Sequence, residues 1–151
     1  VRAMALSNTA VRIGNRQIWE DRISKVKSSG VKALTEETMK RWFSNKFLES
    51  KELPIWKNMF ERQPAKGYTG CSHAISGTDF YTSTSSLRLP TIAIAGSEDG
   101  STPPDLVRET CNLIPGSKFN LIKGVGHIPC VEAPRKYAKI LSDFMKEIGH
   151  V

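Results

Sequence analysis

The sequence lacks any long apolar run, since no stretch approaches the roughly 18 consecutive apolar residues that a membrane-spanning helix needs. Its start also lacks the charged segment followed by an apolar stretch that is typical of a secretory signal peptide. The 151 residues, 39% of them hydrophobic, are enough to bury the core of one ordinary domain. We therefore expect one soluble, cytoplasmic domain with no membrane partner.

Cysteine is scarce, with residues only at Cys71, Cys111 and Cys130. An odd number in a chain without a secretion signal argues against a disulfide framework and for reduced thiols. Cys71 with His73, and His127 with Cys130, have spacings loosely like those of metal ligands, but neither makes the paired four-ligand pattern of a structural zinc site. We expect small buried side chains, with a metal site as the alternative.

Acidic residues are outnumbered, because 22 Lys and Arg against 15 Asp and Glu give a formal net charge of +7. The basic residues are spread over the predicted helices and form no aromatic-interleaved stripe or nucleic-acid motif. We interpret them as a solvated surface and expect no nucleic-acid partner. Two other interpretations are attraction of an anionic substrate by the overall field and neutralisation by an acidic partner half.

The hydrophobic pattern divides the chain into three parts. Residues 1–14 hold a short apolar run and a polar stretch, which predict a buried strand and a loop. Residues 15–75 have apolar side chains at helical spacing, and several helices in succession without a strand look like an insertion. Residues 76–151 alternate strand, turn and helix, with β-rich runs at 91–95 and 119–122. The alternation predicts parallel strands joined by crossover helices, the α/β class.

Local signals predict individual helices. Thr35, followed by two Glu residues, is expected to cap the start of a helix with its hydroxyl. Pro54 is expected to begin another helix that ends near Arg62, and Pro134 to begin the last one. The polar stretch 82–86 carries no predicted element.

The predicted strands make an incomplete sheet. Their composition indicates burial on both faces, yet at least one strand edge would stay unpaired, which is unfavourable for a parallel sheet. We expect a missing N-terminal half of the molecule, or self-association of this chain, to cover that edge.

Candidate catalytic residues follow two of the predicted strands. Asp99 lies in the Gly-rich loop after one strand, and His127 lies in the Gly-rich loop after the next. Ligands of open α/β sheets bind beyond the carboxyl ends of the strands, so neighbouring strands would bring these side chains together there. A carboxylate bonded to an imidazole fixes its tautomer and stabilises the imidazolium. Taken singly, such an Asp is more often a turn former and such a His a structural residue.

Two motifs around these residues are those of a known superfamily. Residues 96–103 match G-x-x-D-x-x-T-P after an apolar strand, and residues 124–134 match G-x-G-H-x-x-x-x-E-x-P after the next strand. The chain therefore resembles the C-terminal portion of an α/β-hydrolase, in which acid and then histidine follow the nucleophile. Segments 6–14, 102–107 and 126–132 make it most similar to 3-oxoadipate enol-lactonases. By this resemblance, residues 15–75 correspond to a helical cap.

The resemblance implies hydrolysis of 3-oxoadipate enol-lactone, a small anionic substrate, to 3-oxoadipate in the β-ketoadipate route of aromatic catabolism, without a metal or organic cofactor. Asp99 would orient His127, and His127 would act as general base toward a serine and then toward water, through an acyl-enzyme. The serine is missing, because G-x-S-x-G occurs nowhere and Ser72 neither has the second glycine nor follows a strand. The oxyanion donors are missing with it, so we predict that this chain alone does not turn over the lactone.

Two residues are candidates for substrate contact. Arg12 follows the first predicted strand and would bind the carboxylate of an anionic lactone, with a surface ion pair as the alternative. Trp19, on the apolar stripe of the first helix, would wall the pocket, although packing within the cap is the commoner role. Two other function classes stay open: another capped α/β-hydrolase, such as an esterase, a carbon-carbon bond hydrolase or a dehalogenase, and a non-catalytic fragment or binding module.

Overall fold

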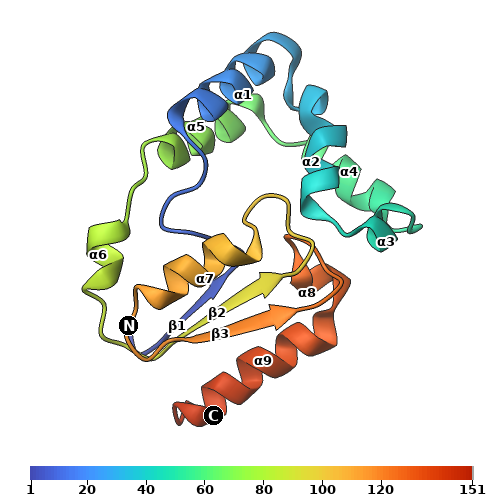
Figure 1. Cartoon of the computed structure of the whole chain (residues 1–151). Helices are drawn as coiled ribbons and strands as arrows, with labels where there is room; N and C mark the ends of the chain where they lie inside the picture. The colour runs from blue at the N-terminus through green and yellow to red at the C-terminus, as the bar shows by residue number, and fades with distance from the viewer. Residues whose placement is uncertain (151) are drawn as a thin grey trace.

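The computed structural model describes residues 1–150 and contains a parallel sheet with helices on either side (Figure 1). The strands are β1 (Met4–Ser7), β2 (Thr91–Gly96) and β3 (Lys118–Ile122), in the spatial order β1-β2-β3. The helices are α1 (Arg16–Ser29), α2 (Thr35–Trp42), α3 (Asn45–Leu48), α4 (Leu53–Glu61), α5 (Ala65–Ser76), α6 (Tyr81–Ser85), α7 (Pro104–Asn112), α8 (Pro129–Glu132) and α9 (Pro134–Glu147). The predicted α/β class is confirmed.

Alternation along β2 places different side chains on the two faces of the sheet. Ile92 and Ile94 pack on the α9 side with Phe144, while Ala93 and Ala95 pack on the α7 side. All of β2 is buried, as expected for the central strand of a parallel sheet. Because alanine is small, α7 can approach the sheet closely and hold the loop between β2 and α7 at the sheet's carboxyl end.

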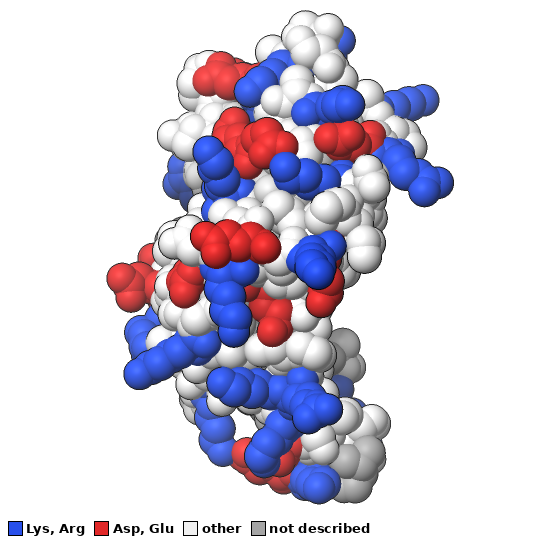
Figure 2. Space-filling model, turned by 90° about the vertical axis from the view of Figure 1, so that its right-hand side faces the viewer, with Lys and Arg blue, Asp and Glu red and all other residues white. Residues whose placement is uncertain are grey.

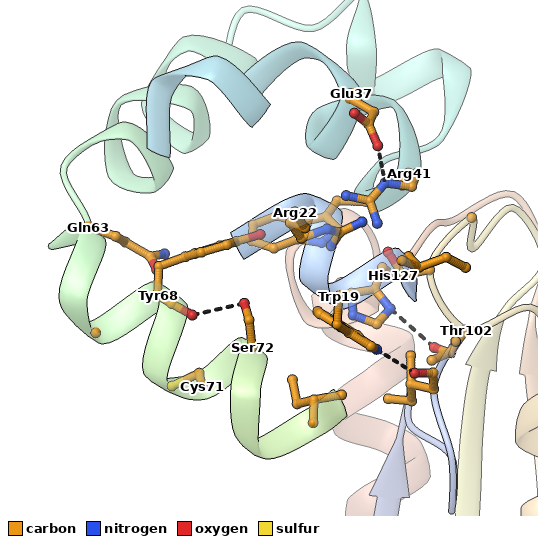
Figure 3. Close-up of a pocket in the computed structure, with 18 residues that line it drawn as sticks. Trp19, Arg22, Glu37, Arg41, Gln63, Tyr68, Cys71, Ser72, Thr102 and His127 are labelled. Atoms are coloured by element: carbon orange, nitrogen blue, oxygen red, sulfur yellow. Dashed lines mark hydrogen bonds and ion pairs between the residues drawn. The ribbon is translucent and has the colours of Figure 1, made fainter. Parts of the chain in front are cut away.

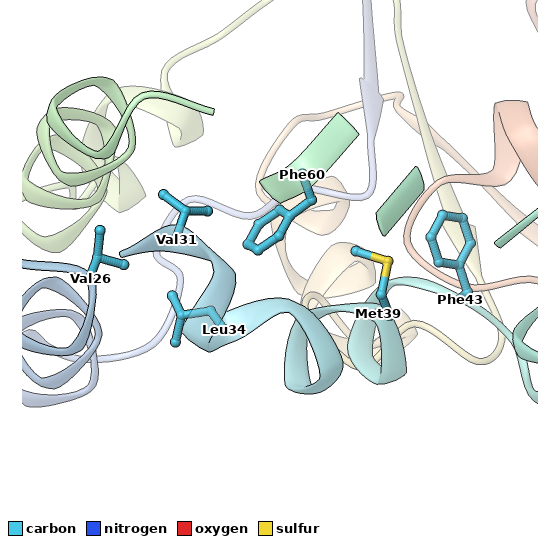
Figure 4. Packing of buried hydrophobic residues seen from close by; sticks show 6 residues of the cluster. All are labelled: Val26, Val31, Leu34, Met39, Phe43 and Phe60. Atoms are coloured by element: carbon cyan, nitrogen blue, oxygen red, sulfur yellow. The ribbon is translucent and has the colours of Figure 1, made fainter. Parts of the chain in front are cut away.

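Helices α1 to α5 form a layer beyond the carboxyl ends of the strands, which we call the helical group (Figure 1). It has its own apolar core, made of Val26, Val31, Leu34, Met39, Phe43 and Phe60 (Figure 4). Ile128 and Val131, which follow β3, pack against this core. Hydrophobic contacts therefore fix the helical group directly to the loop that carries His127.

Several local predictions were wrong. Thr35 does not cap α2, because the helix continues from a 3-10 turn at Val31–Leu34 and Thr35 is its first residue. Its hydroxyl is buried without a hydrogen-bond partner among the described residues. The polar stretch after residue 80 forms α6. Of the cysteines, only Cys111 is buried, while Cys71 and Cys130 are exposed.

The surface carries charges of both signs. On the face in Figure 2, Lys and Arg side chains are interspersed with Asp and Glu. Ion pairs such as Lys139 with Asp143 (2.7 Å) join charges of opposite sign on the surface. The basic excess on this face is therefore not gathered into one stripe. Within residues 1–150, no helix is long and apolar enough to cross a membrane.

Candidate active site

Two glycines allow the loops after β2 and β3 to touch. A Cβ added at Gly96 would collide with the carbonyl oxygen of Gly126, and a Cβ added at Gly126 would collide with that of Trp42. The backbone N–H of Glu98 donates to the carbonyl of Val125 at 2.9 Å, which joins the two loops. Only residues without a side chain permit this approach, so the glycines set the distance between the candidate catalytic groups.

Asp99 and His127 meet at the carboxyl end of the sheet, with 2.9 Å between Asp99 Oδ2 and His127 Nδ1. The Asp99 side chain is fully buried, and its Oδ1 accepts hydrogen bonds from the backbone N–H groups of Ser101 (2.7 Å) and Thr102 (2.9 Å). Its Oδ2 also accepts from the hydroxyl of Thr102 (2.8 Å) and the amide of Asn8 (2.9 Å). These donors fix the carboxylate in one orientation.

The same contacts determine the pKa of Asp99. Burial is the largest single influence and raises the pKa, but the hydrogen bond and charge of His127, helped by Asn8 and Thr102, together lower it by more. The pKa of Asp99 is therefore below its ordinary value, and the carboxylate is ionised at neutral pH.

His127 is held through its backbone as well as its ring. The backbone N–H of His127 donates to the carbonyl of Trp42 at 2.7 Å. The rings of His127 and Trp42 stack with their centroids 6.4 Å apart. An ionised carboxylate only accepts, so Nδ1 carries the proton shared with Asp99 and Nε2 is the basic nitrogen. The side chain is 24% exposed and lines a cavity. This arrangement suits a general base toward a group bound there.

Glu132 connects the histidine loop to the helical group. Its Oε1 accepts from the N–H of Gly126 at 2.7 Å, and its carboxylate also accepts from the N–H (3.2 Å) and the hydroxyl of Ser44, the residue that caps α3. A single carboxylate thereby satisfies donors from both parts of the molecule, which positions His127 relative to the helices above it.

A cavity of about 570 Å³ lies between the helical group and the strand ends (Figure 3). Its walls come from α1, α2 and α5, and its floor from residues 100–102 and His127. Its volume is within the range of small-molecule sites. Within residues 1–150, no group of three or more His, Cys, Asp or Glu side chains is placed as metal ligands would be.

The two predicted substrate contacts lie in different surroundings. Trp19 lines the cavity, is 9% exposed and donates from its indole N–H to the carbonyl of Ile13 at 2.7 Å. Arg12 is exposed and does not line the cavity. The N–H of Val11 donates to Thr110 and its carbonyl accepts from Phe80, and this anchorage leaves the next residue on the outer surface. The position of Arg12 therefore does not fit the predicted contact.

Ser72 also lines the cavity, but its surroundings are those of a structural residue. It lies within α5, and its hydroxyl donates to the carbonyl of Tyr68 at 2.9 Å in the preceding turn. A nucleophilic serine instead stands on a sharp turn from strand to helix. The structure thus agrees with the sequence in giving Ser72 no nucleophile elbow.

Three polar residues near the predicted pair were missed. Asn8 donates to Asp99 from the loop after β1, where its backbone has a positive φ of 49° that Asn tolerates better than most residues. Arg22 and Arg41 line the cavity from α1 and α2. Asn8 lies in the loop at the end of a predicted strand, a position that sequence reasoning can search. The arginines lie on amphipathic helices, where only the packing decides which side chains face the cavity.

The three-stranded parallel sheet and the carboxylate–imidazole contact at its edge have the arrangement of the C-terminal portion of an α/β-hydrolase fold. Among solved structures, the enol-lactonase from Burkholderia xenovorans LB400 aligns with a TM-score of 0.91 and 28% identity, over 97% of this chain and 56% of that one. A thermophilic esterase from Thermogutta terrifontis aligns with a TM-score of 0.89 and 20% identity, over 99% of this chain and 57% of that one.

Curated relatives are enol-lactonases. The 3-oxoadipate enol-lactonase 1 of Acinetobacter baylyi is 29% identical over 148 residues, which are 97% of this chain and 55% of the relative. The chain thus spans about half the length of the curated relatives it matches. No family model matches the chain. The resemblance to α/β-hydrolases, and among them to 3-oxoadipate enol-lactonases, is confirmed.

Proposed function

We propose that this chain supplies the acid and the histidine of an enzyme that hydrolyses 3-oxoadipate enol-lactone to 3-oxoadipate, in the β-ketoadipate route of aromatic catabolism. The observation that carries the proposal is the 2.9 Å contact between buried Asp99 and His127 on the floor of the cavity. The choice of substrate rests on the relatives, which are named as enol-lactonases. The cavity's volume and its largely apolar walls suit a small lactone.

In this proposal, Asp99 keeps the proton on His127 Nδ1 so that Nε2 is free to accept one. Nε2 takes the proton of a serine hydroxyl as the serine attacks the lactone carbonyl, and it gives this proton to the enol oxygen as the ring opens and an acyl-enzyme forms. Nε2 then takes a proton from water, which attacks the acyl group, and returns that proton to the serine oxygen as the acid is released. The helical group acts as a cap that excludes bulk water, and Trp19 forms part of its wall.

The serine and the oxyanion donors come from outside this chain in the proposal, because G-x-S-x-G is absent from its sequence. An N-terminal half, or a second copy of the chain, would also pair the outer edge of β1. The isolated chain is therefore expected to be inactive. A burst of acylation when the isolated chain meets the lactone would contradict this.

A substrate panel on the intact enzyme tests the reaction. We expect kcat/KM to be highest for the enol-lactone, and a His127→Ala variant to lose about a thousandfold or more. The leading alternative is an esterase, favoured by the close structural match to the Thermogutta enzyme. Faster hydrolysis of simple aliphatic esters than of the lactone would favour that alternative.

A further inference from the structure

The cavity contains two arginines that the proposed acyl transfer does not use. Arg22 projects from α1 and Arg41 from α2, and Figure 3 shows both guanidinium groups on the same side of the cavity, above His127. Among the lining residues, Glu37 carries the one carboxylate. The lining therefore carries more positive than negative charge.

Arg41 has an unsatisfied donor. Its Nε is buried and makes no hydrogen bond within residues 1–150, while Glu37 Oε1 lies 3.9 Å away, beyond hydrogen-bond distance. One terminal nitrogen makes a long contact of 3.3 Å with the hydroxyl of Thr38. Guanidinium offers five N–H donors, and leaving a buried one unpaired is costly. Such a group is suited to an acceptor that arrives with a ligand.

Arg22 and Arg41 also repel each other. Burial lowers the pKa of Arg41 most, the charge of Arg22 lowers it further, and Glu37 offsets only part of this. Glu37 neutralises Arg41 only weakly, because Lys25 Nζ lies 3.8 Å from Glu37 Oε2 and the Glu37 side chain is 58% exposed to solvent. Arg22 additionally stacks over the ring of Trp19, 5.0 Å from its centre, which keeps its guanidinium at the cavity wall. An anion between the two arginines would relieve the repulsion.

We propose that Arg41 and Arg22 form a carboxylate-binding subsite that selects lactones or esters with a free carboxylate on an arm beside the reacting carbonyl. The inference rests on the proposed function for its placement near His127. A carboxylate is the fitting anion, because two planar forks can each offer it paired N–H donors. This subsite replaces Arg12 as the source of the positive charge that an anionic lactone requires.

Calorimetric titration of the chain itself tests the subsite without any need for turnover. The probes are a saturated γ-lactone carrying an acetate arm and the same lactone with the arm converted to a neutral primary amide. We expect the carboxylate to bind more tightly than the amide, and Arg41→Gln to weaken only the carboxylate, by about 10- to 100-fold. Arg22→Gln should weaken it in the same direction. Arg135→Gln on α9, outside the cavity, removes one exposed positive charge and should change binding less than twofold.

A second readout uses the cysteines. Cys71 lines the cavity, whereas the exposed Cys130 does not, so bound carboxylate should slow alkylation of Cys71 by iodoacetamide and leave Cys130 unaffected. Protection should disappear in Arg22→Gln, which keeps the half-buried Arg41 and so tests the subsite even if Arg41→Gln fails to fold.

Equal binding of the two probes by the native chain, or undiminished carboxylate binding by both arginine variants, would overturn the subsite. Lactone hydrolysis by the intact enzyme reports on the proposed function separately. Carboxylate binding that depends on Arg41, together with an intact enzyme inactive on the lactone, would support the subsite and overturn only the reaction.

Discussion

Replacing Asp99 by Asn should both destabilise the chain and move a proton on His127. Oδ1 of Asp99 receives two backbone N–H groups, from Ser101 and Thr102, so the oxygen of the new amide must take that place. The new NH2 then occupies the site of Oδ2, where Asn8 donates at 2.9 Å and His127 Nδ1 lies at 2.9 Å. To accept from this NH2, His127 must move its proton from Nδ1 to Nε2.

The magnitude follows from the contacts. Hydrogen bonds to an ionised acceptor become neutral ones, which loses about 1 kcal/mol for each of several bonds. The Asn8 amide N–H would then face the new NH2, and Asn8 can avoid this only by flipping its amide. The flip turns Asn8 Oδ1 toward the carbonyl oxygen of Gly126, which in the native chain lies 3.4 Å from Asn8 Nδ2. Against these losses, a buried amide costs less to desolvate than a buried carboxylate. We expect a net loss of about 2–3 kcal/mol in the free energy of unfolding.

Urea titration measures the loss of stability, and ¹⁵N NMR of the histidine rings measures the tautomer among only three histidines. Asp143→Asn is the matched control, because Asp143 makes an exposed pair with Lys139 and its loss should cost less than about 0.5 kcal/mol. A variant at position 99 that keeps the proton on Nδ1, or is as stable as the control, would refute the reasoning.

Three further outcomes are expected. Because folding lowers the pKa of Asp99, its contribution to stability is complete above the ordinary carboxyl pKa of about 3.9 and is lost as the pH falls further. The free energies of unfolding of the native chain and of Asp99→Asn, measured by urea titration, should therefore converge in acid. Gly126→Ala places a Cβ 2.9 Å from the carbonyl carbon of Trp42 and should lower the free energy of unfolding by about 1–3 kcal/mol or prevent folding. Gly70→Ala in α5 has no atom within 4 Å of the new Cβ and should raise stability by about 0.5–1 kcal/mol. Equal melting temperatures of the two variants would contradict this pair of predictions. Glu132→Gln replaces the carboxylate that accepts from both the histidine loop and the helical group, and it should lower the free energy of unfolding by about 1–2 kcal/mol in a urea titration. An unchanged urea midpoint would argue against a stabilising role of Glu132.

The meeting of Asp99 and His127 could be predicted from the strand topology together with the glycines in both loops. Neighbouring parallel strands deliver their loops to one edge, and glycines at both loops mark the close approach. The last two strands and the last helix could be predicted from periodicity because their apolar patterns are strong. Motif spacing was therefore enough to predict Asp99 and His127, the part of the site that the sheet positions.

The remainder depends on packing between segments far apart in the sequence. Arg41 faces the cavity because the apolar side of α2 packs on α4, and nothing local distinguishes it from the exposed Lys40 beside it. Helix α5, rich in Gly, Ser and Thr, has weak periodicity and is stabilised by its contact with α1. Arg12 lies outside the cavity, because a strand end fixes where a loop begins, not which of its side chains turns inward.

Kinetics of the intact enzyme with Asp99→Asn, His127→Gln and the double variant test the central claim most directly. If the two residues act as one unit, each single variant should lower kcat/KM for the enol-lactone by about a thousandfold or more, and the double variant should be no worse than the poorer single one. Independent losses that multiply in the double variant, or a single variant with native kcat/KM, would contradict the assignment.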